Sequence, residues 1–171
     1  MEGAGPSVSL VIGGGSFQSI WYWILTLAVW IRVCHHTLGV PNDMVPRARR
    51  LPEVAARVDD LARLASLRIG GIYDRAGVPL AALAGFGLTV LLVLGFGSGL
   101  EFAKAAFVLL FPRAVVAYST LRLALAVRRK RQAGEDLRRS LGKRRIWHAL
   151  IAWTGLAAAV SLALLEHAPR G

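Results

Sequence analysis

The sequence has long stretches without any charged side chain. Residues 3–31 and 76–100 contain no Lys, Arg, Asp or Glu, although the 171-residue chain carries a net charge of +11. The hydrocarbon core of a bilayer is about 30 Å thick, and a helix of about 20 predominantly apolar residues can cross it. This separation of apolar from charged residues is atypical of a soluble basic protein and predicts a membrane protein.

The sequence also lacks the common signatures of catalysis and of secretion. A single cysteine, Cys34, excludes an intramolecular disulfide framework. There is no G-x-S-x-G motif of a hydrolase. The N-terminus has no basic region of a cleavable signal, since the first positive side chain is Arg32. We therefore predict that the protein is not an enzyme and that it holds no cofactor.

Four apolar segments have the length of a membrane span. Their approximate bounds are residues 17–38, 78–100, 102–127 and 146–165. Lys104 and Arg113 interrupt the third segment. The predicted fold is an all-α, integral membrane four-helix bundle, with residues 1–171 forming a single membrane domain.

Positive side chains gather in two connections between these segments. Seven arginines lie in residues 39–77, and nine lysines and arginines lie in residues 128–145. The positive-inside rule therefore places both connections in the cytoplasm and both termini outside. Basic segments next to a membrane attract anionic lipid head groups. The second connection has no aromatic side chains that could stack on bases, so we predict no nucleic-acid partner.

The first connection is expected to have structure of its own. Pro41 and Asp43 predict a turn, with Asp43 placed to cap a short helix. Apolar residues then recur at three- and four-residue steps, which predicts a cytoplasmic amphipathic helix of about four turns between spans one and two. We expect this helix to pack on its own protein or to lie on the membrane, with a partner helix as the alternative. Its apolar positions are Val54, Val58, Leu61, Ala65 and Ile69.

Small residues recur every fourth position in the second and fourth spans. Such faces let helix backbones approach closely in lipid. We favour packing inside the bundle and leave contact with another protein open. The two faces are Gly77, Ala81 and Gly85, and Gly155, Ala159 and Ala163.

Arg113 lies about halfway through the third predicted span. A charge at that depth costs between about 3 and more than 10 kcal/mol, so it normally faces protein or water. Its neighbour Pro112 has no N–H and leaves the carbonyl of Val108 without its helical partner. Arg113 could contact a partner subunit, a lipid head group or an anionic ligand. Alternatively, it donates to the carbonyls freed at the proline or extends toward the cytoplasm.

A cysteine and two histidines end the first predicted span. Adjacent histidines such as His35 and His36 project about 100° apart on a helix, so they do not easily share one metal ion. His148, near the start of the fourth span, could pair with either of them as a haem ligand. Interfacial histidines are more often amphipathic side chains with a polar tip, so the haem site is kept only as an alternative.

Two stretches resemble a small alphaproteobacterial inner-membrane protein family. They are "FQSIWYWILTLAVWIRVCHHTLGVPNDMVPRARR", residues 17–50, and "EFAKAAFVLLFPRAVVAYSTLR", residues 101–122. The resemblance is carried by "WYW", by the "LGVPNDMVPRARR" junction and by "EFA…LLFP". Some members are labelled as a component of the Suf iron–sulfur assembly complex. The resemblance implies a multi-pass protein of the bacterial inner membrane.

We expect the junction and the proline of the third span to contact a partner or lipid. The residues concerned are Asp43, Arg47, Arg49, Arg50, Pro112 and Arg113. The predicted function is a non-enzymatic accessory, scaffold or assembly component of a larger membrane complex, with other membrane subunits as partners. One alternative is a subunit of an oligomeric transporter or channel. A second is a haem- or metal-bearing redox protein.

Overall fold

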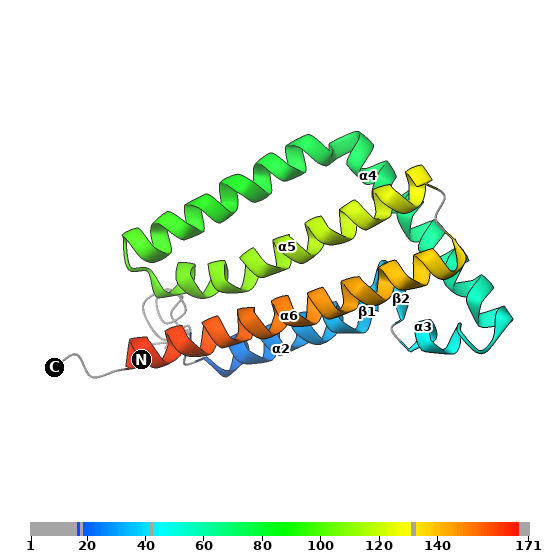
Figure 1. Ribbon diagram of the computed structural model, residues 1–171. Coiled ribbons are helices and arrows are strands. Elements are labelled where there is room, and N and C mark those ends of the chain that lie inside the picture. Colours follow the sequence, from blue (N-terminus) through cyan, green and yellow to red (C-terminus); the bar gives the residue numbers. More distant parts are fainter. Residues whose placement is uncertain (1–16, 18, 42, 131–132, 168–171) are drawn as a thin grey trace, which may run out of the picture.

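The chain is almost entirely helical in the computed structural model, which describes residues 17, 19–41, 43–130 and 133–167 (Figure 1). The helices are α2 (Ile20–His35), α3 (Met44–Arg47), α4 (Pro52–Leu92), α5 (Glu101–Lys130) and α6 (Gly134–His167), with a π-helical turn η1 (Val93–Gly97) after α4. Two short strands, β1 (His36–Thr37) and β2 (Val40–Pro41), pair antiparallel between α2 and α3. The prediction of an all-α protein is confirmed.

Among the described residues, three helical segments are long and apolar enough to cross a membrane. They are Pro52–Gly97, Glu101–Arg129 and Gly134–Leu165. The first contains most of the second predicted span, and the other two contain the third and fourth. The first predicted span corresponds to α2, which has only 16 residues. At 1.5 Å per residue, α2 is about 24 Å long, somewhat short of a hydrocarbon core of about 30 Å.

The first predicted span ends earlier than expected, because a β-hairpin replaces its last turn. Thr37 pairs with Val40, and the two residues between them both have positive φ, 54° at Leu38 and 73° at Gly39. A two-residue turn with two positive φ values matches the twist of paired strands. Leu38 and Val40 are both buried, and this burial offsets the cost of the left-handed conformation at Leu38.

The predicted cytoplasmic helix and the second span form one continuous helix, α4. No residue between them stops the helix, and Figure 1 shows α4 as two arms joined by a bend. Pro79 lies inside α4. Its ring crowds the carbonyl four residues earlier and it has no N–H to donate, so proline is a common cause of such bends. The first arm, which carries residues 54–69, thus leads directly into the apolar second arm, which carries residues 78–92.

The larger hydrophobic core lies at the end of the molecule where the first arm of α4 meets the end of α5 and the start of α6. We call this the basic end. Val58 and Ala62 of α4 are fully buried there. Val54, Ala65 and Ile69 also pack against this core, and the remaining members of α5 and α6 are Leu123, Ala124, Val127, Leu137 and Leu141. Four of the five predicted apolar positions of α4 therefore pack in this core, whereas Leu61 is exposed.

A second contact joins α2, α5 and α6 in the middle of the molecule. Trp30, Val33, Val116 and Ala152 form a small buried cluster. A Cβ added to Gly155 would lie 2.9 Å from Cζ2 of Trp30 and 3.2 Å from Cγ of Pro112. The absence of a side chain at Gly155 therefore lets α6 approach both neighbouring helices.

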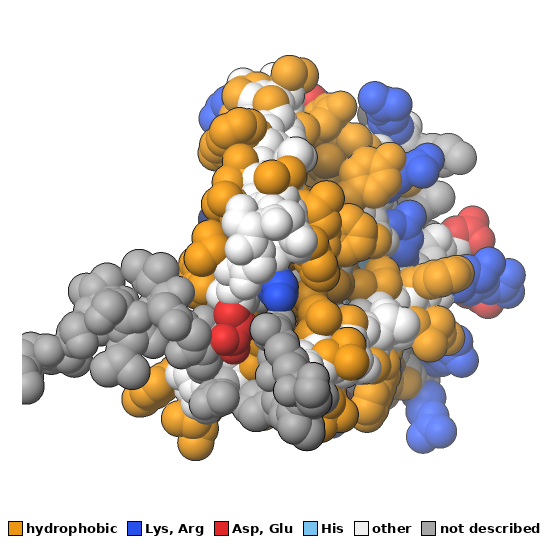
Figure 2. Space-filling view, turned by 90° about the vertical axis from the view of Figure 1, so that its left-hand side faces the viewer, with side chains coloured by type: hydrophobic (Ala, Val, Ile, Leu, Met, Phe, Trp, Pro, Cys, Tyr) orange, Lys and Arg blue, Asp and Glu red, His pale blue; other side chains and the backbone are white. Residues whose placement is uncertain are grey.

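The second arm of α4 is apolar and largely exposed. Val78, Leu83 and Phe86 are 82%, 68% and 69% exposed. Figure 2 views the molecule from the end opposite the basic end, and hydrophobic side chains cover most of its upper part, where Figure 1 places α4. Such a surface suits a segment surrounded by hydrocarbon.

Candidate functional site

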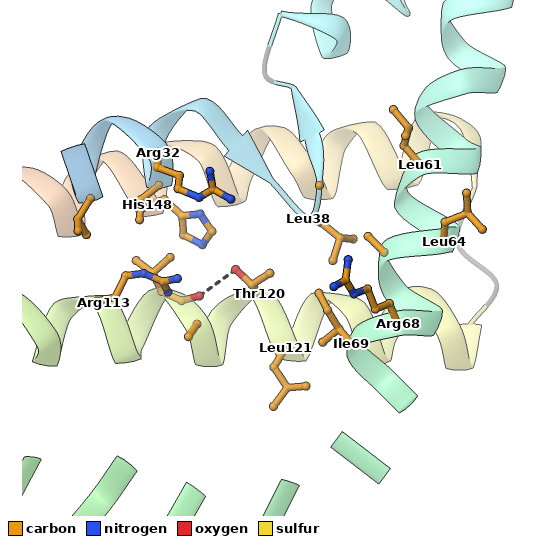
Figure 3. A pocket seen from close by; sticks show the side chains of 16 residues that line it. Arg32, Leu38, Leu61, Leu64, Arg68, Ile69, Arg113, Thr120, Leu121 and His148 are labelled. Atoms are coloured by element: carbon orange, nitrogen blue, oxygen red, sulfur yellow. Dashed lines mark hydrogen bonds between the residues drawn. The ribbon is translucent and has the colours of Figure 1, made fainter. Parts of the chain in front are cut away.

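A cavity of about 1100 Å³ lies between α2, the hairpin, the first arm of α4, α5 and α6 (Figure 3). Its walls are mostly apolar, with side chains that include Val33, Leu61, Leu64, Ile69, Val116 and Leu121. Ligand sites of known proteins have a similar size and a similar mixture of apolar walls with a few polar groups.

Three arginines from three helices line this cavity. They are Arg32 of α2, Arg68 of α4 and Arg113 of α5, and none of the described lining residues is an aspartate or a glutamate. None of the three donates a hydrogen bond or forms an ion pair within the described part of the chain. The cavity is therefore strongly positive without an internal counter-charge.

Arg113 reaches the cavity from the middle of α5. The expected alternative, a hydrogen bond to a carbonyl freed by Pro112, is absent among the described residues. Pro112 itself lies on the side of α5 that faces Gly155 of α6. The proline thus contributes to helix packing, while the neighbouring arginine turns into the cavity.

His148 is the buried polar residue of the cavity wall. It is 2% exposed, and its Nε2 lies 3.4 Å from Oγ of Ser119. Its Nδ1 is buried without a partner in the described structure. Arg144 holds Ser119 in place, because its guanidinium donates both to Oγ at 2.6 Å and to the backbone carbonyl of Ser119. Figure 3 shows the imidazole of His148 on the α6 side of the cavity, across from Arg113 of α5.

Two of the histidines considered as alternative haem ligands, His35 and His148, do not line the same cavity. His35 is exposed at the end of α2 and is not among the described residues that line the cavity with His148. The side chain of His36 lies outside the described part. Within the described ranges, no group of three or more His, Cys, Asp or Glu residues could hold a metal ion.

The junction after α2 exposes its charged residues, but Asp43 does not act as the predicted cap. The backbone of Asp43 is already helical, with φ −73° and ψ −24°, and its side chain makes no capping hydrogen bond to α3. A capping side chain normally needs an extended backbone at that position. The Asp43 carboxylate instead lies 3.8 Å from Nη1 of Arg47. Arg49 and Arg50 are exposed.

The two small-residue faces have opposite surroundings. On α6, Gly155 and Ala159 are buried and Ala163 is half-buried. On α4, a Cβ at Gly85 would meet nothing within 4 Å, and one at Gly77 would meet only Tyr73 of the same helix. Ala81 is exposed. The internal contact expected for the α4 face is therefore absent from the described part of the chain.

Sequence reasoning identified Arg113 and His148 but missed Arg32, Arg68 and Ser119 as their neighbours. Arg32 and Arg68 looked like ordinary charges beside a membrane. One signal was present: a charge at membrane depth calls for polar groups at similar depth on other helices. Arg32 in the first predicted span and His148 in the fourth are two ionisable groups that could meet this condition.

Comparison with known proteins does not add to this geometry. No protein-family profile, no curated protein and no solved structure matches the chain. The described cavity provides positive charge, hydrogen-bond donors and apolar walls. These groups can bind an anion.

Proposed function

We propose that this protein is a non-enzymatic accessory, scaffold or assembly component of a larger complex in the bacterial inner membrane. The observation that supports this proposal is the small-residue face of α4, in which Ala81 and Gly85 are exposed and Gly77 is half-buried beside Tyr73. The resemblance of the junction to an inner-membrane family supports the location.

Contact with lipid and contact with a second helix favour different residues in a membrane helix. Contact with lipid explains why the second arm of α4 is apolar, but it does not explain glycines spaced four residues apart. Glycine inside a helix costs about 1 kcal/mol relative to alanine. A small-residue face recovers this cost when a second helix packs against it, because the two backbones can then approach closely. The partner we propose is therefore a membrane-spanning helix of another subunit.

The test compares matched substitutions in α4. Ala81→Ile fills the small-residue face, and Ala82→Ile places the same side chain one position along the helix, about 100° away. We expect a tagged wild-type protein and Ala82→Ile to recover the same partner from native membranes. Ala81→Ile should recover at least about tenfold less, the effect of losing roughly 1.4 kcal/mol of contact energy.

Two results would contradict this proposal. Recovery of the tagged protein alone would argue against a partner, and equal recovery by both variants would argue against this face. If two differently tagged copies of the chain purify together through this face, the oligomeric transporter or channel subunit becomes the better explanation.

A further inference from the structure

The cavity gathers positive charge that nothing in the described chain neutralises. Arg32, Arg68 and Arg113 line one space. All three arginines are exposed in the described chain, so an anion can reach them from outside. Positive side chains beside a bilayer attract anionic lipid head groups. Because the described lining residues include no carboxylate, the missing counter-charge is expected from a bound molecule.

The apolar side chains of the cavity walls indicate which class of molecule binds there. Leu61 and Leu64 of α4 line the cavity, and they are 37% and 64% exposed. A small hydrated anion would leave these apolar side chains uncovered. A molecule with an anionic head and a hydrocarbon tail matches both the arginines and the walls.

We propose that the cavity binds an anionic phospholipid from the surrounding bilayer. Its phosphate would lie between Arg32 and Arg113, which Figure 3 places on either side of His148, since the planar fork of arginine matches phosphate oxygens. Arg68, farther along the cavity, would attract the head group by its charge. The lipid's acyl chains would cover apolar wall residues of the third predicted span, such as Val116 and Leu121. Basic pockets between membrane helices are known to bind acidic lipid head groups in this way.

His148 supplies a second, independent observation. Its Nδ1 is buried and has no partner in the described structure, which is uncommon for a buried polar atom. Ser119, itself held by Arg144, lies beside the other ring nitrogen. The imidazole lines the cavity, so a movement of the ring that exposes Nδ1 would let it bond a lipid head-group oxygen or hydroxyl.

The experiment measures lipid retained by the full-length protein in mixed detergent micelles. The micelles contain equal amounts of phosphatidylglycerol and phosphatidylcholine with the same acyl chains, and native mass spectrometry counts the bound lipids. We expect the wild type to prefer phosphatidylglycerol by about tenfold or more, as charge-assisted contacts would provide. The double variant Arg68→Gln/Arg113→Gln should lose this preference, and Arg113→Lys should keep part of it.

A matched control separates the cavity from general surface charge. Arg63→Gln removes an exposed arginine of the same arm of α4 that does not line the cavity, and it should retain the wild-type preference. Circular dichroism confirms that each variant is folded. If the double variant does not fold, the single substitution Arg68→Gln and the conservative Arg113→Lys are compared with Arg63→Gln instead.

Three results would overturn the inference: equal retention of both lipids by the wild type, an equal loss of preference in Arg63→Gln, or full displacement of the lipid by inorganic phosphate. The last would identify a site for a free anion rather than a lipid. Loss of the partner in the Ala81→Ile experiment leaves lipid retention unaffected, because the cavity and the small-residue face share no residue.

Discussion

Two glycines about two helical turns apart, Gly95 and Gly87, have very different surroundings. A Cβ added to Gly95 in the π-helical turn would lie 2.8 Å from the backbone nitrogen of Lys104. A Cβ added to Gly87, two turns earlier, would meet nothing within 4 Å. The same residue type therefore has a packing role at the first position and none within the described chain at the second.

This difference predicts opposite effects of alanine. Gly95→Ala should lower the free energy of unfolding by about 1–3 kcal/mol, because the opposing backbone of α5 cannot easily move away. Gly87→Ala should be neutral or stabilising by up to about 1 kcal/mol, since alanine favours the helix. Thermal unfolding in detergent, followed by circular dichroism, checks both. Equal midpoints for the two variants would contradict the close approach of η1 and α5.

At the scale of elements, the start of α6 is joined to the first arm of α4. The backbone N–H of Gly134 donates to Oδ2 of Asp59 at 3.0 Å. Gly134, the first residue of α6, has a φ of 66°, which favours glycine. A carboxylate at a helix N-terminus satisfies an N–H that has no partner in the helix and also interacts favourably with the helix dipole. A side chain of one helix thus caps another.

The cap gives a prediction with a neighbouring control. Asp59→Ala should lower the free energy of unfolding by about 1 kcal/mol and speed hydrogen exchange in the first turn of α6. Asp60→Ala removes an exposed carboxylate from the adjacent position and should have little effect. Exchange that is equally fast in both variants would show that the Asp59 contact does not hold α6.

At the scale of the whole molecule, charge is separated from apolar surface along the helices. The arginines of α3 and of the first arm of α4 lie at the same end as the basic segments around the α5–α6 turn, and Figure 1 shows these elements together. The opposite end holds the starts of α2 and α5 and the turn after α4. Under the positive-inside rule we propose that the basic end is cytoplasmic and that α2 completes four spans.

Reporter fusions test this orientation. Alkaline phosphatase needs disulfides that form outside the bacterial cytoplasm. The enzyme should therefore be active when fused after Gly171 and inactive when fused after Arg145. Activity at both positions, or the reverse pattern, would contradict the proposed topology.

Composition and periodicity alone were enough to predict the helices and their apolar character. A segment surrounded by hydrocarbon must satisfy its backbone internally and expose apolar side chains, and both requirements can be read from local sequence. The same information predicted that residues 54–69 carry an apolar side, because a stripe at three- and four-residue steps needs no knowledge of its partner.

Only the tertiary structure decided how these helices meet. It placed a hairpin at Leu38 and Gly39, because burial of Leu38 depends on residues distant in the chain. It left the face around Ala81 exposed, although the similar face around Ala159 is buried. It also brought Arg113 together with Arg32 and Arg68 in one cavity. These outcomes depend on contacts between distant segments, whose geometry local patterns of apolar and charged residues do not contain.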